Sequence, residues 1–137
     1  MPGNIVIFPK EPHSESSAVE SEVAHILAKY SQKPVEILAP RTGYKLKTPD
    51  LIMDGNMWEI KSTCSIKQNS IKDLIKRATR QSKYIVIDTR TVKKPNHKII
   101  TTIKNISSEY ASIQKLLCIL PNDEVIVLKP LKDYNGT

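Results

Sequence analysis

Aromatic residues, glycine and cysteine are scarce in this chain of 137 residues, which has one Trp, one Phe, five Tyr, four Gly and two Cys. Cys64 and Cys118 cannot form a zinc site by themselves, because no His stands at ligand spacing beside either. We expect both to be reduced and buried in the core, as free cysteines usually are. The shortage of aromatic rings also disfavours a surface that binds bases mainly by stacking.

Long apolar runs are missing as well. No stretch approaches the ~20 apolar residues that a membrane-spanning helix needs, so we expect no membrane partner. The first residues, MPGNIVIFPKEP, lack the basic start and long apolar stretch of a signal peptide. The length and the apolar content of 39% fit one soluble domain with a modest core, and we expect a cytoplasmic protein.

The positive charge is concentrated in the middle of the chain. Residues 60–104 carry 12 basic and 2 acidic side chains, whereas residues 1–59 carry 6 and 8, and residues 105–137 carry 3 and 4. A patch of this kind favours a polyanionic partner, most commonly nucleic acid. A solvated basic face without a partner is the alternative.

Hydrophobic spacing predicts an α/β fold, a single domain with a central mixed β-sheet flanked by helices. We expect residues 1–15 to form an N-terminal arm or edge strand and residues 16–137 to form the domain. Helices are predicted from Ser16 or Ser17 to Ser31, from a cap at Asn69 or Ser70 with Asp73 completing a capping box, and from Ile99 to about Tyr110. Strands are predicted at Val35–Leu38, Leu51–Met53, Met57–Ser62, Tyr84–Asp88, Gln114–Leu120 and Glu124–Leu128.

The stretch TPDLIMDGNMWEIKS, residues 48–62, reads as a hairpin whose turn is Asp54-Gly55. Side chains alternate along a strand, so Glu59 and Lys61 share one face, and antiparallel pairing can bring Asp50 near them. Two neighbouring carboxylates repel each other unless a cation lies between them.

These residue types suit a hard divalent cation. Asp50 and Glu59 would bind Mg²⁺ or Mn²⁺, because such ions prefer oxygen ligands. Lys61 would hold or help deprotonate the attacking water, or stabilise phosphate charge. The alternative is structural: Asp50 begins a strand, and Glu59 and Lys61 form an exposed ion pair.

The combination of Pro49-Asp50 with Glu59-Ile60-Lys61 resembles the PD-(D/E)xK signature of restriction-endonuclease-like nucleases. The expected order of helix, three strands, helix and strand is similar to the core of that superfamily. The segments ESEVAHILAKY and SIKDLIKRATRQSKYIVID, with the hairpin between them, are similar to C-terminal toxin domains of bacterial contact-dependent growth inhibition systems, several of which resemble tRNA-cleaving nucleases.

This resemblance implies a metal-dependent nuclease that cleaves RNA, with tRNA the first candidate and DNA the second; a catalytically inactive nucleic-acid-binding module is the other alternative. It implies an acidic immunity protein as a partner and delivery into a target cell's cytosol as part of a larger secreted protein. A glutamate of the first helix would join the site, Glu20 or the competing Glu22, and Gln81 would join from the end of the second helix.

A row of basic side chains follows the hairpin and would draw a nucleic-acid backbone towards it. With few aromatic rings available, recognition of shape and phosphate is favoured over stacking. The residues expected to bind nucleic acid are Lys67, Lys72, Lys76, Arg77 and Arg80, with Lys83 beside them.

Overall fold

The computed structural model describes residues 5–8, 18–38, 49–93 and 97–129. These residues form three helices and seven strands, and both parallel and antiparallel strand pairs occur, which confirms the mixed α/β class. The chain divides into two compact units, Met1–Glu59 and Ile60–Thr137. Within the described ranges, every helix is too short or too polar to cross a membrane.

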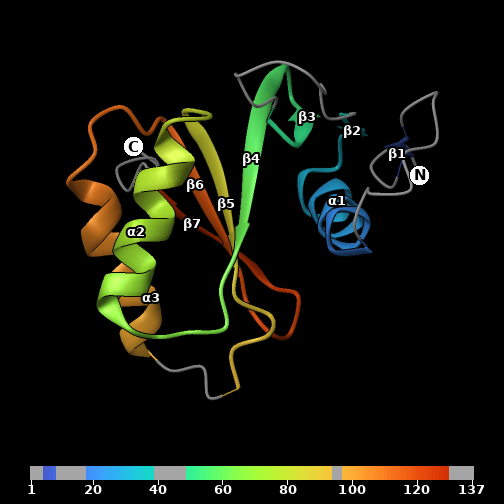
Figure 1. The fold of residues 1–137 in the computed structure, drawn as a ribbon. Coiled ribbons are helices and arrows are strands. Elements are labelled where there is room, and N and C mark those ends of the chain that lie inside the picture. Colours follow the sequence, from blue (N-terminus) through green and yellow to red (C-terminus); the bar gives the residue numbers. More distant parts are fainter. Residues whose placement is uncertain (1–4, 9–17, 39–48, 94–96, 130–137) are drawn as a thin grey trace, which may run out of the picture. The chain divides into compact units, whose positions relative to one another are not determined.

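The first unit is built on helix α1 (Ala18–Ser31), which packs against strands β1 (Val6–Ile7) and β2 (Val35–Ile37) (Figure 1). The predicted helix is therefore confirmed, although its expected caps, Ser16 and Ser17, lie outside the described residues. β1 pairs in parallel with β2, so part of the expected N-terminal arm is a strand. The buried residues of α1 are Val23, Ala24, Leu27 and Ala28.

The predicted hairpin is formed by strands β3 (Leu51–Met53) and β4 (Asn56–Ser62). Its turn residues Asp54 and Gly55 have φ values of 54° and 78°, the left-handed conformations that a tight two-residue hairpin turn requires. The turn makes Met53 and Asn56 partners and, two steps further on, Leu51 and Trp58. Trp58 is buried, and its indole Nε1 donates to the carbonyl of Met53 at 3.1 Å, which helps to hold this register.

The second unit holds the end of β4, helix α2 (Gln68–Thr79), strand β5 (Tyr84–Asp88), helix α3 (His97–Ser108) and strands β6 (Lys115–Ile119) and β7 (Val125–Lys129). β5 and β6 are parallel, and β6 and β7 form the predicted antiparallel hairpin. The two helices lie side by side against these strands (Figure 1). The four apolar positions predicted for the core side of α2 are all buried, namely Ile71, Leu74, Ile75 and Ala78.

The predicted start of α2 is wrong. The helix begins at Gln68, and its N-cap is Lys67, which has an extended backbone and no capping side-chain hydrogen bond. The preceding turn sets the residue at which α2 begins, because the Lys67 backbone N–H donates to Ser65 Oγ at 3.1 Å. Asp73, the expected partner in a capping box, instead forms an ion pair with Arg77 at 3.2 Å.

The prediction for the cysteines is half wrong. Both thiols are free, and Cys118 on β6 is fully buried, but Cys64 is exposed. Cys64 lies two residues beyond Ser62, the last residue of β4, in a connection at the surface where apolar packing does not enclose it.

Lys129, the last residue of β7, caps the C-terminal end of α3. Its Nζ donates to the carbonyls of Tyr110 at 2.7 Å and Ser107 at 3.4 Å. Replacing Lys129 with Met should lower the free energy of unfolding by about 1–2 kcal/mol, because a partly buried charged donor at a helix C-terminus is lost. Urea titration measures this; Lys115→Met, at an exposed lysine of β6, is the control, and equal losses in both variants would contradict the role.

Candidate active site

Asp50 is fixed by its backbone at the point where the hairpin opens. Its N–H donates to the carbonyl of Trp58 and its own carbonyl accepts from the Leu38 N–H, both at 2.9 Å. Continuing the register of Leu51 with Trp58 would pair Asp50 with Glu59. The chain bends at Asp50, however, and its N–H turns to Trp58, an irregularity of the kind that re-aims side chains next to functional sites.

Glu59 is a buried carboxylate in the middle of β4. Its relative exposure is 4%, so it does not belong to a solvated ion pair on the surface, which was the structural alternative for this residue. Burying a carboxylate is costly unless it is neutralised or well hydrogen-bonded. A cation or a proton close to Glu59 would therefore lower the free-energy cost of burying this carboxylate by a large amount.

Glu20 completes a group of three carboxyl groups. Burial raises the pKa of Glu20 to about 7, and the negative charge of Asp50, a hydrogen bond to Asp50 and the charge of Glu59 act in the same direction. Glu20 stands three and four residues before the buried Val23 and Ala24, on the stripe of α1 that faces inward. Glu22 lies off that stripe and is exposed.

The donor set of this group suits a hard divalent ion, because all three side chains offer carboxylate oxygen. Within the described residues, no three His, Cys, Asp or Glu side chains already stand close enough together to enclose a metal ion. Glu20 and Asp50 instead share a side-chain hydrogen bond, which adds to the effect of burial in raising the pKa of Glu20. Mg²⁺ is commonly held by only one or two carboxylates and several waters, so the carboxylates of Asp50 and Glu59 would be sufficient in number.

Lys61 stands two residues after Glu59 on the same strand, and its side chain is half-buried. Strand alternation places it on the Glu59 side of β4. Gln81 follows Arg80, the residue that caps the C-terminal end of α2. The backbone N–H of Gln81 donates to the Ala78 carbonyl at 2.9 Å, and the Gln81 side chain is half-buried. The roles of Lys61 and Gln81 stay predictions.

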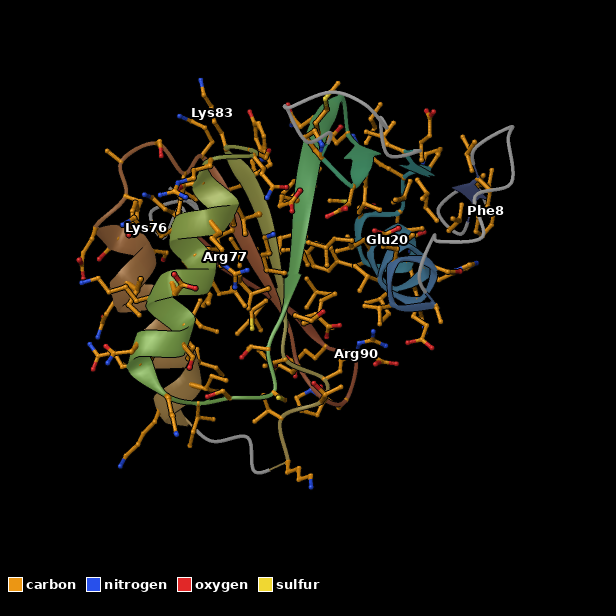
Figure 2. All side chains as sticks on the ribbon, viewed as in Figure 1. Phe8, Glu20, Lys76, Arg77, Lys83 and Arg90 are labelled. Carbon is orange, nitrogen blue, oxygen red and sulfur yellow. The ribbon has the colours of Figure 1, made fainter. Side chains whose placement is uncertain are left out.

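All five predicted nucleic-acid-binding residues are exposed. Lys72, Lys76 and Arg80 follow one another at intervals of four, so they form a single stripe along α2. The charge of Arg77 is partly offset by Asp73, with which it forms an ion pair. We call Lys72, Lys76 and Arg80 the α2 basic stripe; Figure 2 labels Lys76 and Arg77 on this helix.

One polar pair was not predicted. An aspartate at the end of a strand often caps the following turn, and Asp88 does accept from the Arg90 backbone N–H at 3.0 Å. It is also buried and forms an ion pair with the Arg90 side chain at 3.0 Å. The signal in the sequence was an aspartate that ends an apolar strand, with an arginine two residues later.

Comparison with known proteins gives a family and a similar structure. The profile of the contact-dependent growth inhibition CdiA C-terminal domain matches residues 47–125. A chain of the CdiA-CT/CdiI toxin and immunity complex from Burkholderia pseudomallei has a similar fold, with a TM-score of 0.62 and 18% sequence identity over 89% of this chain and 96% of that chain. No curated protein sequence matches the chain.

The matched segment includes the Asp50–Glu59 hairpin, α2, β5, α3 and β6. It covers more than half of the 137 residues. The chain therefore belongs to the CdiA C-terminal domain family of contact-dependent growth inhibition.

Proposed function

We propose that this chain is a toxin domain that hydrolyses phosphodiester bonds with the help of Mg²⁺ or Mn²⁺. The observation that carries the proposal is the group of Glu20, Asp50 and Glu59, with Lys61 two residues further along β4. A purely structural role does not account for it, because bringing three carboxyl groups together costs free energy. The resemblance to PD-(D/E)xK nucleases supplies a chemistry that uses this arrangement.

Each residue has a separate task in this proposal. Asp50 and Glu59 hold the cation, which when bound lowers the pKa of a water and offsets phosphate charge. Lys61 orients the attacking water or stabilises the negative charge that develops on the phosphate. Glu20 accepts a proton near neutral pH, since its pKa is about 7, and is suited to exchanging one with water.

RNA is the first candidate for the substrate and tRNA the first candidate among RNAs, on the resemblance to tRNA-cleaving toxin domains; DNA is the second. The exposed α2 basic stripe supports a nucleic-acid substrate of either kind. A nucleic-acid-binding module without catalytic activity is the rival. This rival is disfavoured because binding alone does not require the carboxyl groups of Glu20, Asp50 and Glu59, which would repel the phosphates of a nucleic acid.

An immunity protein is the proposed protein partner. The similar fold comes from a toxin and immunity complex, and the charge of +7 favours an acidic partner. Such a partner would protect the producing cell by covering the basic surface. Membership of the CdiA C-terminal family supports delivery of the domain into the cytosol of a target cell as part of a larger protein.

Removing any one of three side chains should abolish most of the cleavage. Asp50→Ala, Glu59→Ala and Lys61→Ala should each lower the single-turnover rate by on the order of 10²-fold or more, and the triple variant by little more than the worst single one. The assay incubates the chain with total RNA and with plasmid DNA, with Mg²⁺ or with EDTA. Glu36→Ala, at an exposed residue of β2, is the control and should keep the wild-type rate.

Two results would overturn the proposal. Full cleavage in excess EDTA would exclude the metal mechanism. A folded Lys61→Ala variant that cuts at the wild-type rate would reduce Lys61 to a strand residue without a role in the reaction. Thermal melts of each variant separate loss of activity from loss of fold.

The Glu20 pKa predicts how stability depends on pH when no metal is added. Between about pH 4.5 and 7 the folded chain keeps a proton that the unfolded chain has released, so the free energy of unfolding falls as pH rises through this window. Glu20→Gln should remove the fall and, at pH 8 in EDTA, be more stable than wild type by on the order of 1 kcal/mol, because solvent screens a half-exposed group. Urea unfolding at pH 5 and 8 measures this, with Glu22→Gln as control; identical pH profiles for wild type and Glu20→Gln would contradict it.

The α2 basic stripe predicts the salt dependence of binding. Replacing Lys72, Lys76 and Arg80 with Gln should weaken RNA binding and reduce the slope of log affinity against log salt by about 2, because three phosphate contacts are lost. The charge-matched control replaces three exposed lysines elsewhere, Lys93, Lys104 and Lys115. Fluorescence anisotropy measures the RNA affinity of both triple variants. Equal losses of affinity would show that total charge matters and that the α2 basic stripe has no special role.

A further inference from the structure

Strand β5 ends in a buried, fully engaged carboxylate. Asp88 follows four mostly apolar residues and has a relative exposure of 3%. Its Oδ1 accepts from the Arg90 backbone N–H and from Nε, each at 3.0 Å, and its Oδ2 accepts from Nη2 at 3.1 Å. The Arg90 guanidinium therefore donates to both Asp88 carboxylate oxygens, and such a pair is rigid because the planar, forked guanidinium matches the geometry of a carboxylate.

The same aspartate is tied to the end of β4. The Thr63 N–H donates to the Asp88 carbonyl at 3.0 Å, and Ser62 Oγ donates to Asp88 Oδ2 at 3.4 Å. Thr91 Oγ1 adds a third link by donating to the Thr63 carbonyl at 3.4 Å. These bonds fix the two residues that directly follow Lys61; Figure 2 labels Arg90.

We propose that Arg90 is a positioning residue for Lys61 and acts through Asp88. The inference rests on the proposed nuclease function, in which the Lys61 ammonium must stay at a defined place. Lysine has a long flexible stem, and a strand end without anchors frays, so the backbone beside Lys61 needs a fixed attachment. The Arg90–Asp88 pair supplies it by keeping the Asp88 carboxylate aimed at Ser62, beside the backbone bond from Thr63 to the Asp88 carbonyl.

Stability alone does not explain this pair. Buried ion pairs are often no more stabilising than apolar residues of similar volume, because both charges lose their hydration. The neighbouring strand residues Ile85, Val86 and Ile87 are all apolar and buried. The ion pair instead stands at the end of β5, where Asp88 is bonded to both residues that follow Lys61, which points to a need for fixed geometry there.

Loss of the pair should therefore act on the rate more than on binding. Misplacing a reacting group by about 1 Å can cost on the order of 10²-fold in rate. Arg90→Gln should lower the single-turnover rate at saturating RNA by about 10- to 100-fold and leave the RNA concentration at half-maximal rate unchanged. Arg90→Lys keeps the positive charge but loses the forked guanidinium, so its rate should lie between the rates of Arg90→Gln and wild type. Lys93→Gln, an exposed cation three residues on, is the control and should keep the wild-type rate.

A double-mutant cycle with Lys61 separates positioning from other roles. On a Lys61→Ala background, Arg90→Gln should cause no further loss of rate, because the group it positions is gone. An equal loss on both backgrounds would overturn the proposal, and so would a higher half-maximal RNA concentration with an unchanged maximal rate, which indicates a direct phosphate contact.

Misfolding is controlled by a variant that removes both charges. The double variant Asp88→Leu, Arg90→Met should melt near the wild-type temperature, because no unpaired charge is left buried. Its single-turnover rate of RNA cleavage should still be low. A double variant that is both stable and fully active would overturn the proposal.

A second readout needs no activity. The rate at which an amine-reactive reagent labels Lys61, measured by mass spectrometry against Lys115 in the same chain, should change in Arg90→Gln and not in Lys93→Gln. An unchanged labelling rate would overturn the positioning role. If the wild-type chain cuts no nucleic acid, the proposed function fails, while this labelling result still decides whether Arg90 controls Lys61.

Discussion

The register of the β3–β4 hairpin is the constraint on which the candidate site depends. Leu51 pairs with Trp58, and the Asp50 N–H donates to the Trp58 carbonyl, so the backbone of Asp50 is fixed beside the part of β4 that carries Glu59. The charges of both carboxyl groups act on Glu20. A slip by one residue would turn the side chains of β4, Glu59 among them, to the opposite face of the strand. The Asp54-Gly55 turn and the buried Trp58 indole hold that register against such a slip.

The elements around this hairpin were largely predictable, because local signals agree with the fold there. Asp54-Gly55 is a strong turn signal, and the spacing of Ile71, Leu74, Ile75 and Ala78 identified the buried side of α2. The start of α2 was not predictable from Ser70 and Asp73, because the preceding turn at Ser65 sets where the helix begins. Local propensity is a weak guide where an adjoining turn already holds the backbone.

The site was predictable only in part, since its members come from separate elements. Asp50 and Glu59 stand on the two sides of one hairpin, so antiparallel pairing was enough to predict that they lie near each other. The choice between Glu20 and Glu22 depended on how α1 is rotated against its strands, which small differences in apolar spacing did not reveal. The engagement of Asp88 by Arg90 was also hidden, because burial decides whether an aspartate at a strand end caps a turn or carries an ion pair.

The closeness of Asp50 and Glu59 along the chain has a kinetic consequence. Contacts between residues about ten apart form within microseconds, whereas the contact with Glu20 requires a far longer loop to close. We therefore expect the hairpin to bring two negative charges together before the rest of the fold exists to hold them. Their repulsion opposes the earliest step of folding, and cations in the surrounding medium speed that step by screening it.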